Sequence, residues 1–201
     1  MKTFLTFFVL VHCLISCSQN KQQVLGDTAF QKQLNAQFKD VTKSPLKEED
    51  INDFQGLDFF EVDSAFVVKA HIKRLPNSEF FKMKTTTDRL SSERVYGVLS
   101  FEIKGESYQL NIYQGEDLMT VSGYEDYLFL PFLDLTCGSE SYGGGRYIDC
   151  KIPEGDTLII DFNKAYNPYC AYNDKYSCPI VPRENFLNTR ILAGVKAYKK
   201  H

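Results

Sequence analysis

A period of two in the apolar residues constrains the fold of this chain more than any other feature of its sequence. Between Val95 and Tyr113, two runs alternate apolar with polar residues, and Lys104-Gly105-Glu106 separates them. The apolar positions are Val95, Gly97, Leu99, Phe101 and Ile103 in the first run and Tyr108, Leu110 and Ile112 in the second. Because successive side chains of a strand point to opposite faces of a sheet, this pattern predicts a half-buried β-hairpin.

Alternation or short apolar runs mark further strand candidates, which are 66–73, 127–135, 146–152, 157–162 and 190–198. Ahead of them, a helical spacing predicts an amphipathic helix over 28–40, with an apolar side formed by Phe30, Leu34, Phe38 and Val41. A short helical turn is expected within 47–54. The sequence therefore predicts one mainly-β domain over 25–201, an antiparallel barrel-like or sandwich domain of about seven to eight strands with a leading amphipathic helix.

The composition excludes several classes of protein. Aromatic residues make up 14% of the 201 residues and the formal net charge is only −3, so a disordered chain is not expected. With an isoelectric point near 5.7, the chain lacks the basic surface that nucleic acids require. Histidine is restricted to His12, His71 and His201, and a Ser-His-Asp triad would need His71, which lies on the outward side of a predicted strand.

The first residues have the features of an export signal. A short positive start precedes the apolar run Phe4–Ile15, which is shorter than the roughly 20 residues that span a bilayer. The run ends in Leu14-Ile15-Ser16-Cys17, which resembles the lipobox of bacterial lipoproteins. This resemblance implies a signal peptide over 1–16, lipid attachment at Cys17 and a tether over 17–24. Ser18 after the cysteine resembles the outer-membrane sorting pattern of Gram-negative bacteria, and the lack of an acidic cluster after Cys17 favours an anchor that faces the periplasm. An ordinary secretion signal that contains a cysteine is the alternative.

Four of the six cysteines remain once Cys13 leaves with the signal peptide and Cys17 carries lipid. An exported chain meets an oxidising compartment, so disulfides are expected, and local pairing gives Cys137–Cys150 and Cys170–Cys178. Free thiols at one of these pairs are one alternative. A zinc site is another, which the wide spacing of the cysteines and the lack of a nearby histidine disfavour. No metal and no other cofactor is expected.

Three motifs follow one another in and just beyond residues 129–185. They are Tyr142-Gly143-Gly144-Gly145-Arg146-Tyr147-Ile148-Asp149, then Asp161-Phe162-Asn163-Lys164-Ala165-Tyr166-Asn167-Pro168 with Cys170-Ala171-Tyr172, and finally Ala193-Gly194. Together they resemble the bacterial domain-of-unknown-function 1684 family, which carries a YGGGRY segment, a DFN-A-NP-CAY segment and a C-terminal AG element. The resemblance implies no activity, and Cys137 and Cys150 depart from the pattern that it implies.

The motif residues indicate a binding site for a small anion. Three successive glycines can expose backbone N–H groups, and the planar guanidinium of Arg146 suits a carboxylate or a phosphate. Tyrosines would line such a site and carboxylates lie at the strand ends. The candidate ligand-binding residues are Tyr142, Gly143, Gly144, Gly145, Arg146, Asp149, Asp161, Asn163, Tyr166 and Asn167. The structural alternative is a tight turn in which Arg146 pairs with Asp149 or Asp161.

Three functions are compatible with this sequence. The leading hypothesis is a lipid-anchored β-domain of the cell envelope that binds a small anionic ligand or a partner without turnover, with the membrane as a partner through the anchor. A purely structural envelope protein is the second. The third is a periplasmic hydrolase, in which two carboxylates such as Asp149 and Asp161 act as a pair.

Overall fold

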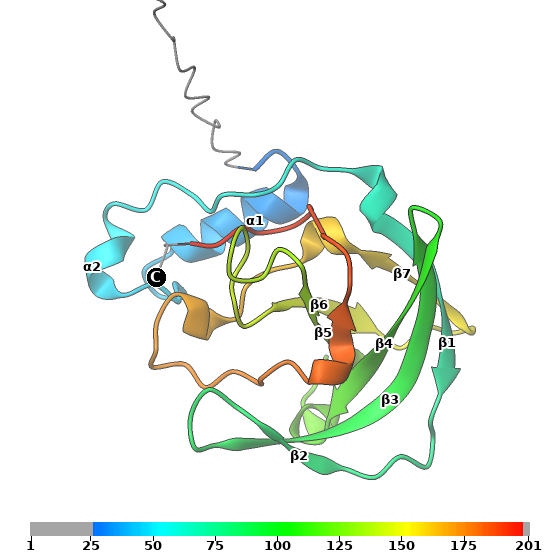
Figure 1. The fold of residues 1–201 in the computed structure, drawn as a ribbon. Coiled ribbons are helices and arrows are strands. Elements are labelled where there is room, and N and C mark those ends of the chain that lie inside the picture. The colour runs from blue at the N-terminus through cyan, green and yellow to red at the C-terminus, as the bar shows by residue number, and fades with distance from the viewer. Residues whose placement is uncertain (1–25, 199–201) are drawn as a thin grey trace, which may run out of the picture.

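The computed structural model describes residues 26–198, and their central feature is one curled eight-stranded sheet that forms half of a barrel (Figure 1). Six strands follow the order β6-β5-β4-β3-β1-β7, while β2 pairs with β3 and β8 pairs with β5. All these pairs are antiparallel except β5 with β8. The strands are β1 (Val67–Arg74), β2 (Phe81–Lys84), β3 (Leu90–Ile103), β4 (Glu106–Gly115), β5 (Tyr127–Asp134), β6 (Arg146–Lys151), β7 (Thr157–Asp161) and β8 (Phe186–Leu187). The predicted mainly-β, antiparallel architecture is confirmed; the expected signal peptide, Cys17 and the tether lie outside the described residues.

The predicted hairpin is formed by β3 and β4, which are longer than the alternating pattern alone indicated. Leu99 pairs with Leu110, and both side chains are buried. Lys104 and Gly105 form the two-residue turn with φ of 52° and 85°. Positive φ at both positions is the geometry that matches the twist of two antiparallel strands. The alternating side chains and the turn chemistry therefore specify the same register.

The main core lies on the inner face of the curled sheet. Alternate residues of β1 point into it, and Ala70 and Ile72 are almost fully buried. Two aromatic rings fill its centre, since Phe132 and Phe162 pack edge to face with their centroids 5.2 Å apart. Each large apolar side chain buried in this way contributes about 1.5–3 kcal/mol through its removal from water.

Between residue 26 and the sheet lie two α-helices, α1 (Ala29–Lys39) and α2 (Glu48–Ile51). At the start of α1, Thr28 and Gln31 form a capping box, in which each side chain accepts a hydrogen bond from the other's backbone N–H. Phe38 is buried against the ring of Tyr172, at 4.7 Å between centroids. This confirms the leading helix, but Val41 is 71% exposed because the helix ends two residues before it.

The remaining helices are short 3-10 turns, and they connect the strands. They are η1 (Ser64–Phe66), η2 (Asp117–Thr120), η3 (Phe162–Lys164), η4 (Tyr169–Ala171) and η5 (Arg183–Asn185). None of the helices within residues 26–198 is long and apolar enough to cross a membrane.

The segment 190–198 is not a strand, which corrects the expectation from its apolar pattern. It forms one isolated bridge, between Val195 and Phe59. Gly194 has φ of +80°, and a Cβ there would lie 2.5 Å from the carbonyl oxygen of Ala165, so the chain turns and packs closely instead of extending. Side chains bond its backbone: Arg146 donates to the carbonyls of Ile191 and Ala193, and Asp134 accepts from Ile191 N.

The Asn185 side chain links β4 to β5 where the two strands are no longer paired through their backbones. The two strands share one register pair, Tyr113 with Phe129. Beyond it, the fully buried amide of Asn185 accepts from Asn111 N at 3.0 Å and donates to Asn111 O at 2.8 Å and to Pro131 O at 2.6 Å. Asn185 thus replaces a missing stretch of the ladder, since buried backbone groups need partners.

Candidate functional site

Arg146, at the start of β6, is an internal strut. Its side chain is 0% exposed, and Nη2 lies 3.1 Å from Oδ1 of Asp134 on β5. The guanidinium also donates to the carbonyl oxygens of Ile191, at 2.9 Å, and of Ala193. This corrects the expectation of a ligand contact: the group that was to bind an anion is inside the protein, and its ionic partner is neither Asp149 nor Asp161.

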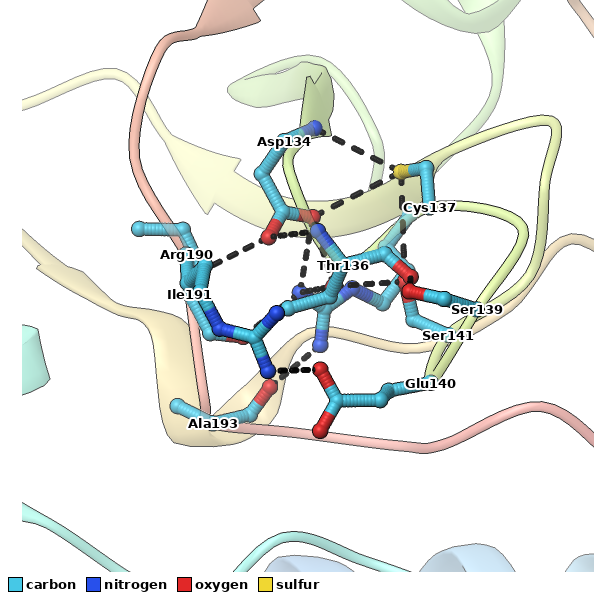
Figure 2. Close-up of polar contacts among 10 residues, drawn as sticks. Asp134, Thr136, Cys137, Ser139, Glu140, Ser141, Arg190, Ile191 and Ala193 are labelled. Carbon is cyan, nitrogen blue, oxygen red and sulfur yellow. Dashed lines mark hydrogen bonds and ion pairs between the residues drawn. The ribbon is translucent and has the colours of Figure 1, made fainter.

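The Asp134 carboxylate completes this buried network (Figure 2). It accepts from the backbone N–H of Thr136 at 3.1 Å and of Ile191 at 2.8 Å. The Cys137 thiol lies 3.5 Å from the same carboxylate, and burial raises the pKa of Cys137. The Cys137 thiol therefore stays protonated and is not suited to act as a nucleophile. The network around Asp134 instead holds the C-terminal segment against the sheet.

The triple glycine forms a tight turn, as in the structural alternative. Gly145 N donates to Tyr142 O at 3.1 Å. Gly145 has φ of +90°, and a Cβ there would lie 2.6 Å from Phe132 O, so glycine is required by close packing. Gly144 packs against the ring of Tyr142, and Gly143 is exposed beside Gly138. A backbone hydrogen bond and close packing therefore account for the three glycines, in place of the expected anion-binding loop.

Three other candidate residues hold the loops after β7. Asp161 accepts from Asn163 N at 3.1 Å and pairs with Lys164 at 3.7 Å. Asn163 exchanges hydrogen bonds with the backbone of Asp63 at 3.0 Å in both directions. Asn167 donates to Lys196 O at 2.9 Å. These contacts give all three a structural role.

Asp149 and Tyr166 are brought together, and Tyr127 joins them. Both phenol hydroxyls donate to Oδ1 of Asp149, from Tyr166 at 2.6 Å and from Tyr127 at 2.8 Å. The backbones of Tyr166 and Tyr147 form an isolated bridge, which fixes Tyr166 beside β6. Burial, and then the Asp149 carboxylate, raises the pKa of Tyr127, while burial, and then Tyr127 and Asp149, raises the pKa of Tyr166. Both phenols therefore remain hydrogen-bond donors. We call Tyr127, Tyr147, Asp149 and Tyr166 the tyrosine–aspartate cluster.

A hollow of about 410 Å³ opens between this cluster and α1, and we call it the helix-side hollow. Its lining comprises Phe30, Gln33, Leu34, Gln37, Tyr147, Asp149, Tyr166, Pro168, Tyr169 and Cys178. Asp149 is the one charged residue in that lining. Both hydroxyl bonds use its Oδ1, and the residue is exposed, so Oδ2 can accept a hydrogen bond from a ligand.

Two comparisons with known proteins show the family to which the chain belongs. The model of the family described as "Protein of unknown function (DUF1684)" matches residues 52–196. The chain belongs to this family. A solution NMR structure of an uncharacterized protein of Haloarcula marismortui is similar to it, with 34% identity and a TM-score of 0.66 over 85% of this chain and 92% of that one. No curated protein matches the chain.

The DUF1684 motifs meet in the buried network rather than at the hollow. Arg146 of the YGGGRY segment donates to the carbonyl of Ala193 in the AG element. Gly194 of the AG element packs against Ala165 of the DFN-A segment. Four motif residues also line the helix-side hollow, namely Tyr147, Asp149, Tyr166 and Pro168. Most of the signature therefore builds the fold.

All four cysteines of the described DUF1684 domain are free thiols in the structure. Cys137 contacts Asp134 and Ser141, whereas Cys150 belongs to the main core, so the expected Cys137–Cys150 bond is not formed. Cys178 Sγ accepts from Cys170 N at 3.3 Å, and a hydrogen bond from the Cys178 thiol lowers the pKa of Cys170 to about 6. Pairing of Cys170 with Cys178 in an oxidising compartment stays a prediction.

Proposed function

We propose that this DUF1684 protein is a membrane-anchored bacterial lipoprotein of the cell envelope, whose β-domain binds a small ring-bearing ligand at the tyrosine–aspartate cluster without turnover. The observation that carries the proposal is the exposed Asp149 carboxylate, held by two tyrosine hydroxyls through one oxygen at the wall of the helix-side hollow. Positioned acceptors within an aromatic hollow are the usual basis of small-ligand recognition.

The chemistry of the lining supports a neutral or cationic ligand with a hydrogen-bond donor. Tyr147 packs edge to face with Phe129, at 4.7 Å between centroids, and with Tyr166, at 6.0 Å. Such rings favour the edge or face of another ring. A small anion, the ligand class expected from Arg146, would instead meet the Asp149 carboxylate with no cationic side chain in the lining.

Binding is favoured over hydrolysis by the placement of the candidate catalytic groups. Asp161 bonds to Asn163 and Lys164 and does not line the helix-side hollow with Asp149. His71 lies on the exposed side of β1, 3.7 Å from Asp156. The pairs that would support hydrolysis are therefore not assembled around this hollow.

A matched pair of ring compounds tests the ligand-binding proposal. We expect benzyl alcohol, and not benzoate, to shift the NMR signals of labelled tyrosines saturably in the full chain embedded in lipid nanodiscs, with empty nanodiscs as reference. Asp149→Ala should weaken binding at least about tenfold, because a hydrogen bond to a charged group is worth about 1.5–3 kcal/mol. Asp156→Ala, which removes an exposed carboxylate beside His71, is the control and should bind normally. Preference for benzoate, or equal binding by the Asp149→Ala variant, would contradict the proposal.

The anchor is tested separately, at the residue expected to carry lipid. Cells fed labelled palmitate should label the unmodified protein and not Cys17→Ala, because the thiol of Cys17 is the expected attachment point. Multiple acyl chains on one residue give stable anchoring, so the variant should also leave the membrane fraction. Equal labelling of both proteins, or an intact signal peptide by mass spectrometry, would show that the lipoprotein assignment is wrong.

A further inference from the structure

A second hollow adjoins the first and contains a buried carboxylate that the proposed function does not use. This sheet-side hollow, of about 350 Å³, shares Tyr147 and Tyr166 with the helix-side hollow. Its other walls come from the start of β3, the end of β4, η2 and β5, with Ser91, Glu93, Gly115, Asp117, Tyr127 and Phe129 among the lining residues. Glu93 is only 6% exposed.

One oxygen of Glu93 has no partner. Ser91 Oγ donates to Oε1 at 2.8 Å, whereas Oε2 is buried and makes no hydrogen bond. Leaving a buried carboxylate oxygen unsatisfied is costly, so such a group is a marker of a ligand site when it lines a hollow. Burial raises the pKa of the Glu93 carboxyl, which is the expected response to that cost.

The charges around the sheet-side hollow favour a cation. Asp117 lines it, and Glu116 lies beside it, accepting from Ser92 Oγ at 2.6 Å. The cation at its rim, Arg89, is turned to Ser177, to which Nε and Nη2 donate at 2.9 and 3.0 Å. An incoming cation would therefore meet a buried carboxylate without displacing an existing ion pair.

An organic ammonium group fits this hollow better than a metal ion. Among residues 26–198, no group of three or more His, Cys, Asp or Glu side chains is arranged to hold a metal. The rings of Phe129, Tyr127 and Tyr147 instead line the space beside Glu93. Aromatic faces attract ammonium groups, whereas Mg²⁺ and Ca²⁺ require several oxygen ligands.

We propose that the sheet-side hollow is a subsite for a small organic ammonium group, with Oε2 of Glu93 as its counter-ion and the adjoining tyrosine rings as its walls. This extends the proposed binding site, because the two hollows share Tyr147 and Tyr166, but it rests on a different carboxylate. A ligand with a ring and an amine could occupy both hollows.

Three probes of equal size and different charge test the subsite. In the full chain in nanodiscs, n-propylammonium should shift the NMR signals of labelled Tyr127 and Tyr147 saturably, whereas 1-propanol and propionate should not. The affinity for n-propylammonium should fall at least tenfold in Glu93→Gln. Glu102→Gln removes an exposed carboxylate from the same strand and should leave that affinity unchanged.

The thermal stability of Glu93→Gln provides a second readout. Because the variant removes an unpaired buried charge and keeps an acceptor for Ser91, its melting temperature should equal or exceed that of the unmodified protein. Should the variant fail to fold, the comparison of the three probes on the unmodified chain still decides the question. Equal shifts by 1-propanol, no response to n-propylammonium, or full affinity in folded Glu93→Gln would overturn the subsite. If benzyl alcohol still binds near Asp149 in that case, only the ammonium subsite fails and the proposed function stands.

Discussion

Arg146→Gln is expected to lower the free energy of unfolding by about 3–5 kcal/mol, the cost of removing one partner of a buried ion pair. The substitution leaves Asp134 buried without its cation, and it removes the donors that satisfy the carbonyls of Ile191 and Ala193. For a chain of this size, 1 kcal/mol corresponds to roughly 2–4 °C, so the melting temperature should fall by about 6–20 °C. Thermal unfolding followed by circular dichroism measures this directly.

Arg190→Gln is the matched control for this loss. Arg190 pairs with Glu140 near the same network (Figure 2). Its side chain is 50% exposed. An exposed ion pair contributes about 0–1 kcal/mol, so the control should melt within a few degrees of the unmodified protein. If Arg146→Gln behaves like Arg190→Gln, Arg146 is not a strut.

Asn185→Ala should be the second strongly destabilising change, with a loss of at least about 3 kcal/mol. The truncation leaves three backbone groups without partners, namely the N–H and carbonyl of Asn111 and the carbonyl of Pro131. Each unsatisfied buried group costs about 1–3 kcal/mol. Chemical denaturation in urea gives the free energy of unfolding for comparison with the unmodified chain.

The exposed Asn188 provides the control for Asn185, three residues further along the chain. Asn188→Ala should change stability by no more than about 0.5 kcal/mol, as is usual for surface positions. A loss below about 1 kcal/mol in Asn185→Ala would mean that β4 and β5 do not depend on this amide.

Local patterns were sufficient to predict the hairpin and the leading helix. In β3 and β4 the period of two and the turn at Lys104 and Gly105 lie within one short stretch of chain. In α1 the cap at Thr28 and the spacing up to Phe38 are equally local. The pattern failed for 190–198, because Ile191, Ala193 and Val195 are buried in the hydrophobic clusters while Arg146, rather than a neighbouring strand, bonds the carbonyls of Ile191 and Ala193.

The site could be predicted only in part, because its residues converge from distant segments. Asp149 and Tyr166 belong to the motifs, so the sequence indicated them. Tyr127 resembled an ordinary strand residue, and its role depends on the pairing of β5 with β6. Glu93 was missed because an unpartnered oxygen is a property of the folded surroundings. The sequence indicated Arg146 as a candidate site residue, but it did not indicate Asp134 as its ion-pair partner. A sequence pattern suggests which side chains are buried, whereas their contacts depend on the fold.

Native mass spectrometry of the full chain, extracted gently from a producing bacterium, shows whether the tyrosine–aspartate cluster holds a small molecule. We expect a small-molecule adduct on the unmodified protein that is lost or strongly reduced in Asp149→Ala and retained in Asp156→Ala. An adduct of equal abundance in all three proteins, or the bare lipidated mass in every case, would contradict ligand binding at the tyrosine–aspartate cluster.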